Sequence, residues 1–325
     1  MIKLAMLLIS SIIGAGFSTG AELTAAFGAA DISPFLVASL VGVAVFVLNW
    51  ATYFLCRIGF RPPNVFFVPI YFIFFIGMTA GMAHLITPFG AVLSLVVCCI
   101  VVVTGYEKLS SFNKYIVSFA VLTLVCLGIY YTPTVVGSGD AIVRDISRPL
   151  WFSIMIYAGL NCLIFPIVDT ARQTMSAPRM FASFALSSFV LAFLVWILLP
   201  IASAYHMFSM PNLVAGQNIG TGMHVLVFAT IIVSIFSSQF IALFNIENSL
   251  PKWSLSKSIN AKEKTGGLAR LIVYCIIAVG LSSFGFSAIV SNVYPIVGLF
   301  IVTFLLGSCV WCYFSRRRLP RQNLA

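Results

Sequence analysis

The sequence predicts an all-α integral membrane protein with ten transmembrane helices in one domain. Three observations carry this prediction: only 8% of the 325 residues are charged, 61% are hydrophobic, and apolar stretches recur along the whole chain between short breaks. A soluble domain carries about 25% charged residues, so this chain cannot cover a surface that faces water. The same composition excludes a disordered chain and a nucleic-acid-binding protein.

Each transmembrane helix needs about 20 apolar residues, and glycine, proline and charge clusters mark where the stretches end. Residues 1–27 could also be interpreted as a signal peptide, but Glu22 and the glycines around it favour a retained, functional span. The connection between the last two spans is the shortest, because only Phe284 to Ser287 are available to form the turn. The predicted spans are 3–29, 33–56, 64–86, 89–105, 115–131, 149–169, 180–204, 222–247, 268–286 and 288–313.

The positions of the basic residues predict the orientation. With the N-terminus in the cytoplasm, all of the 18 Lys and Arg residues except Arg144 and Arg148 fall on the inside. This asymmetry is typical of cytoplasmic loops, so both termini are expected to be cytoplasmic. The basic tail, residues 314–325, contains Arg316 to Arg318 and is expected to lie on anionic lipid.

Other motifs do not predict an enzyme. Residues 16–20 match the G-x-S-x-G pattern of serine hydrolases, but that motif needs a strand–turn–helix and here it lies in an apolar span. The eight cysteines lie in or at the ends of apolar spans, and the C-x-x-C of Cys309 and Cys312 is interpreted as packing. We expect no cofactor and no metal beyond a coupling cation.

The first and sixth spans both contain helix-breaking residues. The first has three glycines in seven residues at 14–20, and the sixth has Gly159, Asn161 and Pro166. These spans begin two five-span halves, about 1–131 and 149–313, and an odd number of spans inserts the second half upside down. Interrupted helices at matching places in inverted halves indicate a transporter site, although close packing through small residues is the alternative for the first span.

The residues at these breaks carry a resemblance to a known family. Gly14-Ala15-Gly16-Phe17 resembles the broken first helix of the amino acid–polyamine–organocation (APC) superfamily, and the stretch 14–22 is similar to its YkvI-like bacterial membrane proteins. Tyr157-Ala158-Gly159 is similar to the superfamily's sixth-helix break, where Leu160-Asn161 replaces a glutamate found in many members. The resemblance implies a leucine-transporter (LeuT) type fold in the bacterial cytoplasmic membrane.

The resemblance also implies secondary transport of a small organic solute, an amino acid or amine, by alternating access. Amides around Ala15 to Phe17 would hold a carboxylate, and carbonyls near Tyr157 to Gly159 would receive an amine. A ligand-sensing membrane subunit of the same fold, similar to germinant receptors, is the alternative. The expected solute-binding residues are Gly14, Ala15, Gly16, Phe17, Ser18, Tyr157, Ala158, Gly159, Asn161 and Phe74.

A coupling-cation site is expected between the first and eighth spans. Sodium-coupled transporters of this fold place a carbonyl and two adjacent hydroxyls at the spacing seen in Ser234, Ser237 and Ser238, opposite carbonyls of the first-helix break near Ser10 and Ile13. Hard cations take oxygen ligands, which makes Na⁺ chemically sensible here. The fifth span has no Lys or Arg between 116 and 131, where some proton-coupled relatives place a lysine.

Glu22 is the one carboxylate well inside a predicted span, and an intramembrane charge usually marks function. It could be a proton-coupling group, an outer gate or a structural anchor, with His84 as a possible partner. Asp169 and Arg172 end the sixth span and could be inner-gate charges or exposed loop ions. The outer loop 205–221 is expected to be a lid or a linker.

Overall fold

The computed structural model describes residues 2–28, 33–60, 64–104, 106–135, 149–249 and 261–318. Over these ranges the chain is helical and contains no β-strand, which confirms the all-α prediction. Arg144, Arg148 and residues 319–325, on which parts of the orientation prediction depend, lie outside the described residues.

The first half of the chain folds into seven helical segments. α4 begins with a proline in its first turn. Backbone N–H groups at this position have no partner within the helix, so proline breaks no helical hydrogen bond there. Pro69 lies inside α5. The bounds are α1 Ile2–Ile12, α2 Ala15–Thr19, α3 Ala21–Phe27, α4 Pro34–Arg57, α5 Asn64–Leu85, α6 Pro88–Thr104 and α7 Tyr106–Val135.

The second half contains a short helix, α11, within the predicted outer loop, and a π-helical segment, η1, near the last span. The turn before the last span is at 283–285, with Gly285 at φ 87°, a conformation that favours glycine. The bounds are α8 Leu150–Leu160, α9 Phe165–Arg172, α10 Ala177–Ala204, α11 Pro211–Ile219, α12 Thr221–Ser249, α13 Ala261–Ser282, α14 Phe286–Ala288, η1 Ile289–Val293 and α15 Tyr294–Arg318.

Among the described residues, five segments are long and apolar enough to cross a membrane: Pro34–Arg57, Phe66–Leu85, Ala177–Ala204, Thr221–Leu243 and Phe286–Ser315. α8 and α9 together form a further, bent candidate span. Shorter apolar helices cover Pro88–Ile100, Tyr115–Tyr131 and Ala269–Ser282. Large hydrophobic side chains are exposed along α4, α6, α13 and α15, as on a surface that faces lipid. The structure therefore supports a helical membrane protein, and the ten-span count stays a prediction.

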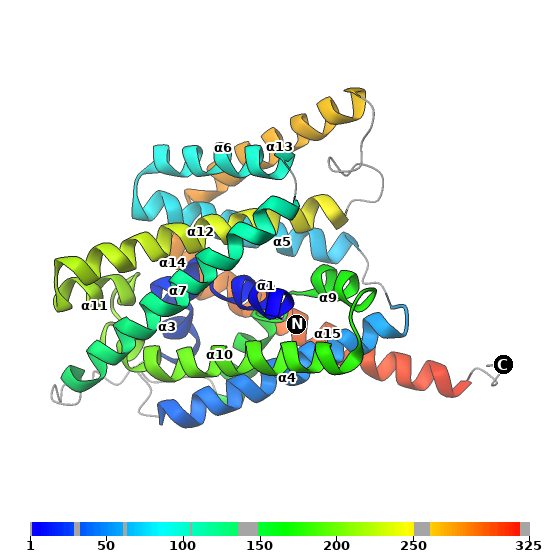
Figure 1. Ribbon diagram of the computed structural model, residues 1–325, viewed down its shortest axis with the longest axis horizontal. Helices are drawn as coiled ribbons and strands as arrows, with labels where there is room; N and C mark the ends of the chain where they lie inside the picture. Colours follow the sequence, from blue (N-terminus) through cyan, green and yellow to red (C-terminus); the bar gives the residue numbers. More distant parts are fainter. Residues whose placement is uncertain are drawn as a thin grey trace.

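The helices enclose the N-terminal segment (Figure 1). α6 and α13 pack together at one edge of the molecule, and α4 and α10 pack together at the opposite edge. Between these two pairs, α1 contacts α7, α10 and α12, and α3 contacts α8 and α10. The residues of the first predicted span are therefore at the centre of the fold.

The packing of α6 against α13 can be tested through its cysteines. The sulfur atoms of Cys99 and Cys275 lie 3.4 Å apart, and all eight cysteines are free thiols. A disulfide needs about 2.05 Å between sulfurs, so a small approach suffices. A variant that retains only these two cysteines is expected to form an intramolecular disulfide on mild oxidation, mapped by peptide mass spectrometry. A variant that retains only Cys126 and Cys275 is the control, and equal cross-linking in both would contradict this packing.

Candidate functional site

The first predicted span is broken twice. α1 ends at Ile12, Gly14 is extended with φ −90° and ψ −169°, and α2 begins at Ala15. A second break follows at Gly20, whose φ of 83° favours glycine. The sequence predicted one interruption in this region, and the structure divides residues 2–27 into three helices.

The sixth predicted span is broken once. α8 ends at Leu160, and the side-chain amide of Asn161 donates a hydrogen bond to the Tyr157 carbonyl at 2.8 Å. α9 begins at Phe165, with Pro166 in its first turn, and its axis is bent by 58° from that of α8. The same carbonyl accepts the backbone N–H of Asn161 at 3.3 Å, so Asn161 caps the end of α8 with both its side chain and its backbone.

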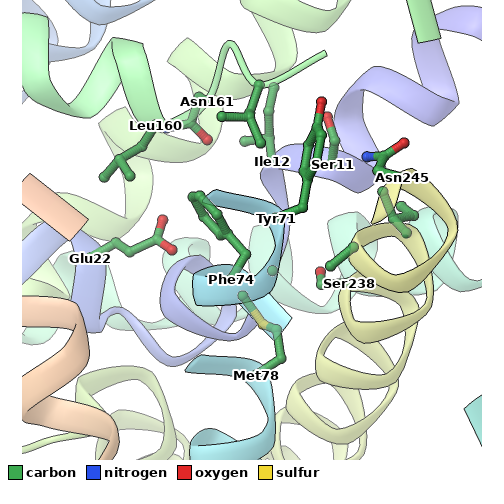
Figure 2. A pocket seen from close by; sticks show the side chains of 14 residues that line it. Ser11, Ile12, Glu22, Tyr71, Phe74, Met78, Leu160, Asn161, Ser238 and Asn245 are labelled. Carbon is green, nitrogen blue, oxygen red and sulfur yellow. The ribbon is translucent and has the colours of Figure 1, made fainter. Parts of the chain in front are cut away.

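The break of the first span at Gly14 and the break of the sixth span open onto one cavity of about 50 Å³, which is enough for a few water molecules. Figure 2 places Glu22 at one side of this cavity and Ser238 and Asn245 at the other, with the rings of Phe74 and Tyr71 between them. We call it the central cavity. Its lining residues are Ser11, Ile12, Gly14, Glu22, Tyr71, Phe74, Met78, Leu160, Asn161, Leu163, Ser238, Ile241, Ala242 and Asn245.

A second, smaller cavity of about 20 Å³ adjoins the same carboxylate. Glu22, Tyr157, Leu160 and Tyr294 are among its lining residues. Tyr294 follows directly after the π-helical segment η1, and its ring packs on Phe74 with centroids 4.9 Å apart. Glu22 and Leu160 therefore lie between the two cavities, which we call the central and the tyrosine cavity.

Several predicted solute-binding residues line these cavities. Gly14, Phe74 and Asn161 line the central cavity, and Tyr157 lines the tyrosine cavity. Phe75, the next residue on α5, is fully buried in the core.

The other predicted solute-binding residues have different surroundings. Phe17 and Ala158 are fully buried in the hydrophobic core. The Ser18 hydroxyl donates to the Gly14 carbonyl at 2.8 Å, which stabilises the start of α2. The side chain of Ala15 lies outside the described residues. Phe17, Ser18 and Ala158 line neither cavity.

At Gly16 and Gly159, another part of the protein lies so close to the glycine backbone that a β-carbon would overlap it. A β-carbon added at Gly16 would overlap the carboxylate of Glu22, so this side chain lies directly against the Gly16 backbone. A β-carbon added at Gly159 would overlap the backbone carbonyl of Gly298, where α8 packs on α15. Gly159 therefore allows close packing of α8 on α15, which is a common role of small residues in membrane helices.

Glu22 is buried, with 7% of its side chain exposed. Within the described residues, no lysine, arginine or histidine forms an ion pair with it. The predicted partner His84 lies elsewhere: it is exposed, and its ring Nε2 is 3.0 Å from the Ser209 hydroxyl. Asp169 and Arg172 pair with each other at 2.6 Å within α9 and are partly exposed.

The serines of the expected cation site lie against the first break. The hydroxyl oxygens of Ser10 in α1 and Ser237 in α12 are 3.0 Å apart. Gly14 approaches Ser238 so closely that an added β-carbon would lie 3.1 Å from its hydroxyl oxygen. The hydroxyls of Ser234 and Ser238 are buried without a hydrogen-bond partner in the described part of the chain. The structure thus brings Ser10 to Ser237, and Gly14, next to Ile13, to Ser238.

Some residues of the site were not predicted from the sequence. Tyr71 and Met78 flank the predicted Phe74 at helical spacing on α5, and the three share one face, which the central cavity touches. Asn245 lies two turns beyond Ser238 on α12. Asn212 of α11 is fully buried and donates to the carbonyls of Ser18, at 3.0 Å, and Phe17, at 3.4 Å. The outer loop 205–221 thus contacts the end of α2.

The described residues contain no group of three or more His, Cys, Asp or Glu side chains with the proximity of metal ligands. Neither the protein-family models nor the curated proteins with which we compared the sequence include a match to it.

Proposed function

We propose that the protein is a secondary transporter that couples the movement of a small organic solute to Na⁺ by alternating access. The observation that carries this proposal is the central cavity, because it is lined by residues of two separate helix breaks and of α12. Broken helices that meet around one cavity supply polar backbone groups where a continuous helix supplies none. A solute bound there contacts elements from both halves of the chain.

The proposal includes a LeuT-type fold of ten spans in two inverted repeats, as in the APC superfamily, with both termini in the bacterial cytoplasm. The described helices are compatible with it, because a helical segment overlaps every predicted span, including the three short helices of 2–27. The break in α8–α9 corresponds to that in α1–α3 when the halves are paired. Reciprocal movement of the two halves would open the cavity to one side at a time.

The proposed Na⁺ ligands are oxygens of Ser10, Ile13, Ser234, Ser237 and Ser238. The buried, partnerless hydroxyls of Ser234 and Ser238 support them, because a buried polar atom without a partner costs free energy that a bound cation would recover. Ser238 also lines the central cavity, so a cation at the serines would lie next to the solute. Such proximity favours binding of the two together, which is the basis of coupling.

We expect NaCl to raise the thermal stability of the purified protein relative to KCl and choline chloride at equal ionic strength. A cation at about 100 times its dissociation constant should add about 2.7 kcal/mol. Ser238→Ala should remove most of this sodium effect. Ser188→Ala is the matched control, because Ser188 in α10 also has a buried hydroxyl without a partner in the described residues but lies between α4 and α10. A sodium effect that survives Ser238→Ala unchanged would reject the site.

Transport itself is tested by flux into vesicles that contain only this protein. With an inward Na⁺ gradient, labelled alanine or choline should accumulate, and replacing Na⁺ by K⁺ should abolish accumulation. Binding without accumulation under any gradient would contradict transport and favour a ligand-sensing subunit. Accumulation driven by a pH gradient alone would replace Na⁺ by H⁺ as the coupling ion.

A further inference from the structure

We propose that Glu22 binds the positively charged nitrogen of the solute, where the central and the tyrosine cavity adjoin. This rests on the proposed function, since it concerns the solute that the central cavity takes. It differs from the expectation derived from the resemblance, in which backbone carbonyls near Tyr157 to Gly159 receive the amine. The proposal makes Glu22 the residue that selects ligands by charge.

The first argument is the charge of the lining. Among the described residues that line the two cavities, Glu22 alone bears a formal charge, and the other titratable groups are the phenols of Tyr71, Tyr157 and Tyr294. A cation is complementary to this lining, and an anion would meet a buried carboxylate with no basic side chain to offset it. The site therefore favours solutes that carry an ammonium group.

The second argument is the position of the carboxylate. It is more than nine-tenths buried, lies against the Gly16 backbone, and lines both cavities without an ion-pair partner in the described chain. A structural anchor would be expected to contact a fixed partner. Glu22 instead points into space that a ligand can enter, and an unpaired charge at this depth is costly unless it has a partner.

The third argument is the aromatic wall beside the carboxylate. Phe74 and Tyr71 line the central cavity, and Phe74 packs on Tyr294, which lines the tyrosine cavity with Glu22. Aromatic rings attract cations through the negative face of the ring, so they add to a carboxylate without competing with it. Across the central cavity, the amide oxygen of Asn245 and the hydroxyl of Tyr71 are buried without partners in the described residues, and both can hydrogen-bond the polar end of a solute.

The size of the cavities limits the solute. The central cavity of about 50 Å³ holds a few groups the size of water, so the geometry favours a short amine or a small amino acid over a large one. The test therefore uses small compounds in pairs of similar size that differ at the nitrogen. Alanine is compared with lactate, and choline with 3,3-dimethyl-1-butanol, in which carbon replaces the charged nitrogen.

Binding of each compound is measured with the purified full-length protein by thermal stabilisation at several concentrations, in NaCl or KCl without competing amines. At least one nitrogen compound should bind about 10-fold or more tightly than the partner that lacks the nitrogen. Glu22→Gln keeps the size of the side chain and removes its charge, and should weaken that binding by about 10- to 100-fold. Glu22→Asp should weaken this binding less than Glu22→Gln does. Ser188→Ala, a control between α4 and α10, should not change it.

Several results would overturn the proposal. They are equal binding within both pairs, no binding of alanine or choline, or unchanged amine binding by Glu22→Gln with loss only of pH-driven accumulation, which would make Glu22 a proton carrier. The paired comparison uses the unmodified protein, so it decides the question even if a variant does not fold. Failure of transport is distinguishable, because vesicles would then show no accumulation of a compound that still binds in a Glu22-dependent way.

Discussion

Replacement of Gly16 by leucine should abolish binding of alanine and choline while leaving a folded, extractable protein. The leucine side chain would occupy the space of the Glu22 carboxylate, since even a β-carbon overlaps it. The overlapping atoms are the far end of a flexible side chain, so Glu22 can move and the fold is retained. Its carboxylate would then no longer lie where the cavities adjoin, and affinity should fall by about 100-fold or more.

The experiment measures thermal stabilisation by each compound and compares the variant with Gly280→Leu. Gly280 lies in α13, and an added β-carbon there meets no heavy atom within 4 Å in the described structure, so this leucine adds bulk without filling the site. Gly280→Leu should bind both compounds normally. Full binding by Gly16→Leu would remove the solute site from this break, and a misfolded Gly16→Leu protein would contradict the flexibility assigned to Glu22.

The glycines of the first span show what could be predicted from sequence. A helix break was predictable because three glycines within seven residues of an apolar span weaken the helix at that point. The contact of Gly16 with the Glu22 side chain was not predictable, because it depends on the direction in which that side chain folds back. The same limit applies to Gly159: its partner, Gly298, is far away in sequence, and the contact exists only once α8 and α15 have packed.

The residues on α5 and α12 show the same contrast. α5 is apolar nearly all round, with many aromatic residues, so its sequence pattern did not show which face meets the cavity and Tyr71 was missed. Ser234, Ser237 and Ser238 were predicted because their spacing resembles that of the carbonyl and hydroxyls in sodium-coupled transporters of the LeuT-type fold. The sequence could not show that the hydroxyls of Ser234 and Ser238 lack hydrogen-bond partners in the described residues, because this depends on how α12 packs against α1.

Replacement of Gly298 by alanine should strongly destabilise the protein. Here the overlap is with backbone: an added β-carbon would strike the carbonyl of Ile156 in α8, which cannot rotate away as a side chain can. α8 and α15 would have to separate, and overpacking of this kind costs about 1–3 kcal/mol. Tyr157 and Asn161, at the end of α8, would move with it, so binding of alanine and choline should weaken as well.

Gly307→Ala is the matched control on the same helix. An added β-carbon at Gly307 meets no heavy atom within 4 Å in the described structure, and alanine is the better helix former by about 1 kcal/mol, so this variant should be as stable as the original or slightly more so. The measurement is the temperature at which half of the detergent-solubilised protein loses its monodisperse elution. If both variants lose stability equally, the α8–α15 contact does not hold the sixth-span break in place. A stability deficit confined to Gly298→Ala, together with weaker binding of alanine and choline, would show that a glycine pair outside the cavities sets their shape.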